Sequence, residues 1–167
     1  MTNQPKKLKI TDIGRQLTAG PELSMRLKTL GVKQGLSLFY WTKSARKCSG
    51  QNHPPEQCPH QWAFIDRNNA INNVGQIKGE IFAAHTASEL GAYLPMELHH
   101  NDREYYFDSM RMHVQDNQLW ILAYRPLTGK RIPLVSVDGA TEAEARAKML
   151  VALDEKQLLI FDEKYDR

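Results

Sequence analysis

Long apolar segments are missing from this 167-residue sequence. Its longest apolar runs, Met149–Leu153 and Leu158–Phe161, are much shorter than the roughly 18 residues that a membrane-spanning helix needs. The N-terminal residues 1–9 have no apolar stretch behind their lysines, which argues against a secretory signal. Two cysteines are too few for a disulfide scaffold. We therefore expect a cytoplasmic protein that does not enter membranes.

Known catalytic motifs are missing as well, since the sequence has no Walker, Rossmann or hydrolase-elbow pattern. The segment His99–Glu104 places histidines beside carboxylates, a combination that general acid–base catalysis uses. Adjacent residues seldom point the same way, however, and no nucleophile or glycine-rich phosphate cradle accompanies them. A solvated charged loop is the favoured interpretation, and we expect no enzyme.

The sequence does have an ordinary globular composition, with 41% hydrophobic and 25% charged residues. Its charge is unevenly distributed. Residues 1–50 carry ten Lys or Arg and only two acids, whereas residues 51–167 carry twelve basic and seventeen acidic residues. Such a division is typical either of a face for an acidic partner or of a solubilising basic tail.

Helix caps and apolar spacing predict four helices and several strands. Pro21 can begin a helix that Gly31 ends, and Thr86 and Thr141 each precede a glutamate by three residues, as in a capping box. The expected helices are Thr11–Leu17, Pro21–Leu30, Thr86–Leu94 and Thr141–Leu158. The expected strands are Ser37–Thr42, Gln61–Asp66, Lys78–Ala84, Tyr105–Val114, Leu119–Arg125 and Ile132–Val137, with 68–73 as a polar turn.

These elements predict an α+β fold with a mostly antiparallel sheet of five or six strands, a hairpin plus a C-terminal meander, and helices packed on one face. A disordered basic tail over residues 1–9 would precede a single domain over residues 10–167. We divide that domain into an N-terminal helical segment (10–35), a hairpin with a third strand (36–84), and a helix, meander and closing helix (85–167).

Three segments carry a resemblance: Arg26–Gln34 leading into Ser37–Trp41, then Ala84–Pro95, then Thr141–Leu153. Their order resembles a pattern in small uncharacterised proteins of phages and mobile genetic elements. There, a helix ending in a Leu-Gly-Val turn leads into a Ser-Leu-Phe-Tyr-Trp strand. The resemblance covers roughly residues 23–155 and implies a mobile-element origin, without a known family function.

Both cysteines fall in one polar segment between the first two expected strands. Cys48, His53, Cys58 and His60 provide two thiols and two imidazoles, the ligand set of a tetrahedral structural zinc. The Cys-x4-His-x4-Cys part resembles half of a retroviral zinc knuckle, although the leading Cys-x2-Cys is absent. A disulfide and an inert polar loop are the alternatives, and a reducing cytosol argues against the disulfide. One structural Zn is therefore the only cofactor that the sequence suggests.

The basic half could contact nucleic acid or a protein partner. Its first two helices have the order of a helix-turn-helix, although they equally fit two helices packed on a sheet. Aromatic residues on the expected strands could stack bases, but they more often form a core. The candidate contact residues are Arg26, Lys28, Lys33, Lys43, Arg46 and Lys47.

Together these observations predict a non-enzymatic protein-interaction module with an unknown protein partner. The alternative is a zinc-stabilised nucleic-acid-binding protein that uses the basic N-terminal half. Binding to nucleic acid would weaken steeply with salt, because released counterions drive it.

Overall fold

The structure is a computed structural model that describes residues 10–35, 37–44, 62–72, 79–114, 117–130 and 132–159. Within these ranges the chain forms five helices and seven strands. The helices are α1 (Ile10–Leu17), α2 (Pro21–Thr29), α3 (Arg67–Asn72), α4 (Ala87–Gly91) and α5 (Glu142–Glu155). The strands are β1 (Phe39–Ser44), β2 (Trp62–Asp66), β3 (Gly79–Ala83), β4 (Glu97–His100), β5 (Arg103–Val114), β6 (Asn117–Pro126) and β7 (Val135–Gly139).

The helix signals of the sequence lie where they were predicted. Pro21 begins α2, and Gly31 follows it with a φ of 88°, a backbone conformation that glycine adopts without strain. Thr86 accepts a hydrogen bond from the Glu89 N–H, and Glu89 accepts one from the Thr86 N–H, so α4 has a complete capping box. Thr141 caps α5 through the Glu144 N–H, and the Glu144 carboxylate accepts from the Ala140 N–H instead. The closing helix is therefore capped by Thr141 without the reciprocal bond.

The strands confirm an antiparallel α+β protein but do not form the single sheet that we expected. The described residues form a three-stranded sheet in the order β2-β1-β3 and a four-stranded sheet in the order β4-β5-β6-β7. The predicted hairpin of β1 and β2 is present, with Trp41 opposite Phe64. The third strand pairs with the other side of β1, and the meander pairs within its own sheet. Local sequence patterns predict individual strands but do not show which strands pair. We therefore expected one sheet of five or six strands where the described residues form two.

Helix α3 occupies a segment that we predicted to be a turn. Asp66, the last residue of β2, accepts hydrogen bonds from the backbone N–H and the side-chain amide of Asn69, at 2.9 and 2.8 Å. This contact satisfies a donor at the start of the helix, and Ala70 is buried. Asparagine runs favour turns, but here the preceding aspartate begins a short helix.

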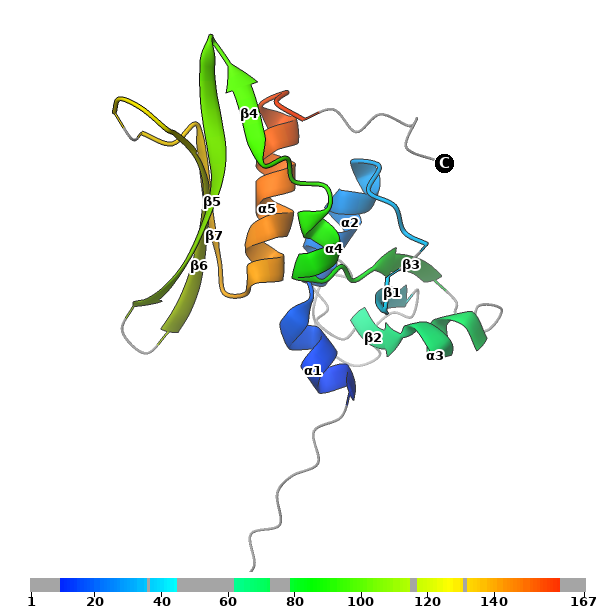
Figure 1. Ribbon diagram of the computed structural model, residues 1–167. Coiled ribbons are helices and arrows are strands. Elements are labelled where there is room, and N and C mark those ends of the chain that lie inside the picture. Colours follow the sequence, from blue (N-terminus) through cyan, green and yellow to red (C-terminus); the bar gives the residue numbers. More distant parts are fainter. Residues whose placement is uncertain are drawn as a thin grey trace, which may run out of the picture.

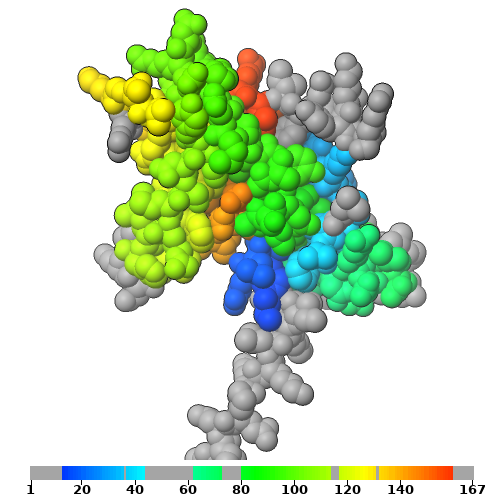
Figure 2. Space-filling view, viewed as in Figure 1, coloured from blue at the N-terminus to red at the C-terminus, as the bar shows by residue number. Residues whose placement is uncertain are grey.

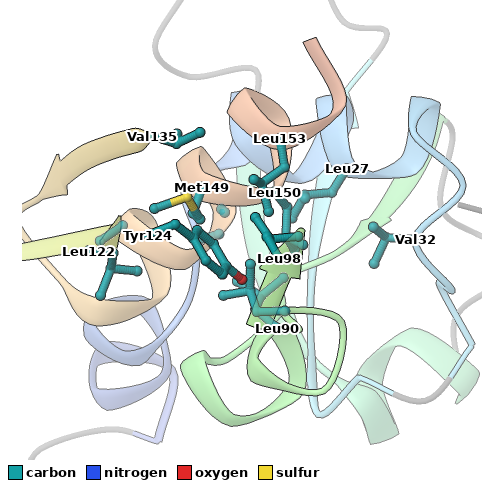
Figure 3. Packing of buried hydrophobic residues seen from close by; sticks show 14 of the residues in the cluster. Leu27, Val32, Leu90, Leu98, Leu122, Tyr124, Val135, Met149, Leu150 and Leu153 are labelled. Carbon is teal, nitrogen blue, oxygen red and sulfur yellow. The ribbon is translucent and has the colours of Figure 1, made fainter. Parts of the chain in front are cut away.

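The described helices lie on one side of the four-stranded sheet, and α5 packs directly on it (Figure 1). Helix α2 contacts both α5 and β3, so it joins the two sheets. The core forms between these layers, where Leu150 and Leu153 of α5 lie beside Leu27 of α2 (Figure 3). All three side chains are completely buried. The opposite face of the four-stranded sheet has no helix of the described residues on it.

Hydrogen bonds also hold the segment between α1 and α2 in place beside the three-stranded sheet. The indole N–H of Trp41 donates to the Ala19 carbonyl at 2.9 Å, and the Ala19 N–H donates to the His85 carbonyl at 3.0 Å. The buried His85 in turn contacts the Lys33 carbonyl through Nε2 at 2.9 Å. These contacts fix the chain between α1 and α2 against the segment that follows β3.

Among the described residues, no helix has both the length and the apolar character that crossing a membrane requires.

Candidate functional site

Strands β5 and β6 extend beyond their neighbours in the four-stranded sheet. They pair along ten positions, from Tyr105 opposite Pro126 to Val114 opposite Asn117. Strand β4 pairs only with residues 103–106 of β5, and β7 pairs only with residues 120–124 of β6. Within the described chain, residues 108–114 therefore have a strand partner on the β6 side alone, which leaves a free sheet edge.

The backbone groups at this edge can be identified from one hydrogen bond. The Phe107 N–H donates to the Met96 carbonyl at 3.0 Å, just before β4 begins, so this N–H points away from β6. Backbone groups of successive strand residues point alternately to the two sides. The N–H and C=O groups of Ser109, Arg111 and His113 therefore point to the same free edge.

The sheet face opposite α5 carries an apolar patch beside this edge. Met110 lies opposite Ile121, and Met112 lies opposite Leu119. Alternation along the strands places these four side chains on the face opposite the buried Leu122 and Tyr124. Met110 and Met112 are 42% and 38% exposed, respectively. We call Met110, Met112, Leu119 and Ile121 the outer apolar patch.

Acidic residues adjoin the patch on the same sheet face. Asp108 lies two residues after Tyr106 on β5, so both side chains are on this face. The Asp108 carboxylate forms an ion pair with Arg125 of β6, with 3.1 Å between Oδ2 and Nε. Asp138 lies opposite Ile121 on β7 and is exposed. Farther along β5, the Tyr106 hydroxyl donates to Glu104 Oε2 at 3.1 Å. This hydrogen bond, followed by burial and by the charges of Glu104 and Glu97, raises the pKa of Tyr106 above its usual value of 10.0. This face therefore carries the exposed carboxylate of Asp138 and the Glu104–Tyr106 hydrogen bond, while Asp108 is paired with Arg125.

The segment His99–Glu104 is a β-hairpin instead of the predicted loop. Asn101 and Asp102 have positive φ angles of 49° and 58° and form a two-residue turn between β4 and β5. Positive φ at both positions is the signature of the type I′ turn, whose twist matches that of paired strands. The turn projects from the surface at the top of the molecule (Figure 2). The Asn101-Asp102 pair was the available sequence signal, because both residue types tolerate positive φ, but we interpreted it as part of a loop.

The predicted zinc ligands Cys48, His53, Cys58 and His60 all lie outside the described residues, as do Arg46 and Lys47 of the predicted basic surface. The zinc hypothesis therefore stays a prediction of the sequence.

The four described basic candidates are divided among different contacts. Arg26 of α2 forms an ion pair with Glu155 of α5. Lys28 lies over the Phe82 ring with its ammonium 4.8 Å from the ring centre, and Lys43 lies over Trp62 at 5.6 Å. Lys33 follows α2, and its carbonyl contacts His85. The partners of Arg26, Lys28 and Lys43 thus lie on three separate elements, α5, β3 and β2.

Depressions on the described surface are open. One lies at the β4–β5 turn and is lined by residues 99–104. Another lies between α2, β7 and α5, and its lining includes Arg26, Asp138, Lys148 and Glu155.

When the chain is compared with protein-family models, with curated proteins and with solved structures, nothing matches.

Proposed function

We propose that the chain is a non-enzymatic protein-interaction module that binds an extended segment of a partner protein along the free edge of β5. The observation that carries the proposal is the edge of residues 108–114, which no strand of the described residues pairs, next to the exposed outer apolar patch. Extended peptides often bind by adding a strand to such an edge, with main-chain hydrogen bonds providing affinity.

The edge offers an ordered set of hydrogen-bonding groups. Ser109, Arg111 and His113 each present one N–H and one C=O in the plane of the sheet, held in place because β5 is paired with β6. Proteins usually protect such edges with short strands, prolines or covering segments. Here the open part extends over several residues and contains no proline. A bound strand would satisfy these groups and extend the sheet.

Side chains beside the edge specify the chemistry of the partner segment. An added strand would place every second residue on the outer face, next to Met110 and Met112. Methionine is flexible and polarisable, so these side chains can adapt to different apolar residues. The exposed Asp138 shares this face and favours Lys or Arg in the partner, whereas Asp108 is already paired with Arg125. The expected partner is an extended segment of alternating apolar residues with basic residues nearby.

The test uses peptides selected against the full chain from a displayed library, followed by titration of individual peptides by calorimetry. Ser109→Pro removes an N–H that faces the free edge while it leaves the β6 ladder intact. We expect Ser109→Pro to weaken peptide binding at least tenfold and Ser109→Ala to preserve it. Wild-type affinity in a folded Ser109→Pro variant would reject the proposal.

Amide exchange measured by NMR gives an independent readout. The amides of Ser109, Arg111 and His113 should become protected when the peptide binds. Those of Met110 and Met112 point to β6, so their protection should change little. Equal protection of both sets, or protection confined to another element, would contradict strand addition.

The predicted alternative, nucleic-acid binding by the basic half, has a different signature. It requires affinity for a DNA or RNA oligonucleotide that falls steeply as salt rises, and insensitivity to Ser109→Pro. Strand addition depends mainly on backbone bonds and apolar contact, so its salt dependence should be shallow.

A further inference from the structure

Glu97, His99 and Glu104 bring three potential metal ligands together at the β4–β5 hairpin. Glu97 and His99 are two residues apart on β4 and therefore share a face, and Glu104 of β5 lies directly opposite His99. One donor atom from each side chain lies within 4.8 Å of the other two. These residues lie far along the chain from the predicted cysteine–histidine site at residues 48–60.

We propose that Glu97, His99 and Glu104 bind a divalent transition-metal ion, with Zn²⁺ as the expected ion. An imidazole nitrogen with two carboxylate oxygens suits Zn²⁺ better than Mg²⁺ or Ca²⁺, which prefer oxygen ligands. Three protein ligands would leave a coordination position for water. The proposal concerns a site separate from the strand edge and does not depend on the proposed function.

The required geometry is close to the one observed. Zinc–ligand bonds of about 2.0–2.2 Å place tetrahedral donors roughly 3.4 Å apart. The His99 Nε2 atom already lies 2.8 Å from Glu97 Oε1, and the remaining separations within the 4.8 Å limit need small rotations. The His99 side chain is 72% exposed and that of Glu97 is 39% exposed, so both can rotate without disturbing the core. At this distance His99 Nε2 and Glu97 Oε1 can share a proton in a hydrogen bond. A metal ion would take the place of that proton and bind the same two atoms.

The hairpin holds the three ligand backbones in a fixed relation. On its other face, Leu98 and Tyr105 are each 8% exposed and belong to the core. The turn at residues 101–102 fixes the register that places His99 opposite Glu104. The Tyr106 hydroxyl contacts Glu104 Oε2 and orients this carboxylate, as second-shell donors commonly do in metal sites. Because the backbones are already fixed, metal binding would have to restrict only the rotations of the three side chains.

The experiment must separate this site from the predicted site at Cys48, His53, Cys58 and His60. We would titrate Zn²⁺ by calorimetry into demetallated full-length chain carrying Cys48→Ser and Cys58→Ser. One equivalent of Zn²⁺ should still bind. In this background, His99→Ala should abolish the equivalent or weaken it at least tenfold, and Glu104→Gln should weaken it similarly. Circular dichroism would show that each variant is folded.

His100→Ala is the matched control, because His100 is the next residue on β4 and alternation directs it to the opposite face. Zinc binding should be unchanged in this variant. Titration with Co²⁺ adds a spectroscopic readout: visible absorption bands of the bound ion should appear in the double-serine background and should be lost in His99→Ala but not in His100→Ala. Absence of a Zn²⁺ equivalent in the double-serine background would overturn the proposal. Equal losses in His99→Ala and His100→Ala, or no loss in either, would also overturn it.

Discussion

The two sheets bury their apolar surfaces by different means. The four-stranded sheet places Leu122 and Tyr124 under α5, where both are completely buried with aliphatic neighbours. The three-stranded sheet relies more on aromatic packing, with Trp41 edge-on to Phe64 at 4.8 Å and Trp62 edge-on to Phe82 at 5.6 Å, whereas the four-stranded sheet places Phe107 beside Tyr124 at 5.5 Å. Basic side chains then lie over the rings of the three-stranded sheet: Arg15 over Trp41 and Phe64, Lys28 over Phe82 and Lys43 over Trp62.

This difference changes the meaning of the basic N-terminal half. A count of charges suggests a surface for an acidic partner, but several of these cations cover aromatic faces within the chain. A cation over a ring stabilises the fold and shields an apolar surface from water. The acidic half also has cations over rings, Arg111 over Trp120 and Arg146 over Phe107. It differs in combining carboxylates with a strand edge that no described strand pairs and with exposed methionines. The contrast directs the search for a partner toward the four-stranded sheet.

The largest effect is expected where the helix-covered layer is disrupted. Leu150 is completely buried between α5 and its neighbours, so Leu150→Ala should lower the free energy of unfolding by about 2–5 kcal/mol. The matched control is Leu38→Ala, next to the three-stranded sheet, because Leu38 is 58% exposed; its effect should stay within about 0.5 kcal/mol. Urea unfolding measures both. Similar losses in the two variants would show that Leu150 is not at the centre of the core.

A smaller loss is expected at Tyr124, whose hydroxyl donates to the Pro95 carbonyl at 2.6 Å. Tyr124→Phe leaves this carbonyl without its partner and should cost about 1–2 kcal/mol at neutral pH. Tyr40→Phe, at a half-buried tyrosine of β1, is the control and should cost less. Equal effects would mean that the hydroxyl contact to Pro95 contributes nothing measurable.

Tyr124 also predicts an alkaline pH dependence. Burial raises the pKa of Tyr124 far above its usual value of 10.0. Because the folded-state pKa lies above the unfolded one, its contribution to stability is complete below pH 10.0 and is lost as pH rises toward the folded value. The wild type should therefore lose stability above pH 10 more steeply than Tyr124→Phe, as urea unfolding at successive pH values would show. Parallel profiles would contradict a buried, neutral Tyr124.

Local signals in the sequence predicted most elements because their causes are local. Pro21, Thr86 and Thr141 act within one helical turn, and the aromatic run that forms β1 favours a strand through its own side chains. Helix α3 was missed because the residue that caps it, Asp66, is also the last residue of a strand. A strand residue is not where the sequence is searched for a helix cap. Strand β4 was missed because it has only four residues and its charged side chains resemble those of a loop.

The division into two sheets and the candidate sites depend on contacts between distant residues. Nothing in the β5 sequence shows that β4 stops pairing at Tyr106, yet this endpoint creates the free edge. His99 faces Glu104 only because the turn has two residues; a turn one residue longer would change the register. Histidines beside carboxylates were visible in the sequence, whereas their convergence required the strand pairing.

The smallest predicted effect tests the cations that lie over the three-stranded sheet. Lys28→Met retains an apolar side chain but removes the charge over Phe82, and should cost about 0.5–1 kcal/mol. Lys130→Met, at an exposed lysine after β6, should be nearly neutral. A double-mutant cycle with Phe82→Leu isolates the interaction, since the loss from Lys28→Met should shrink when the ring is absent. If Lys28→Met lowers stability by the same amount in the Phe82→Leu background, the contribution of Lys28 does not come from its contact with the ring. The aromatic rings of the three-stranded sheet would then be stabilised by packing, without a measurable contribution from this cation.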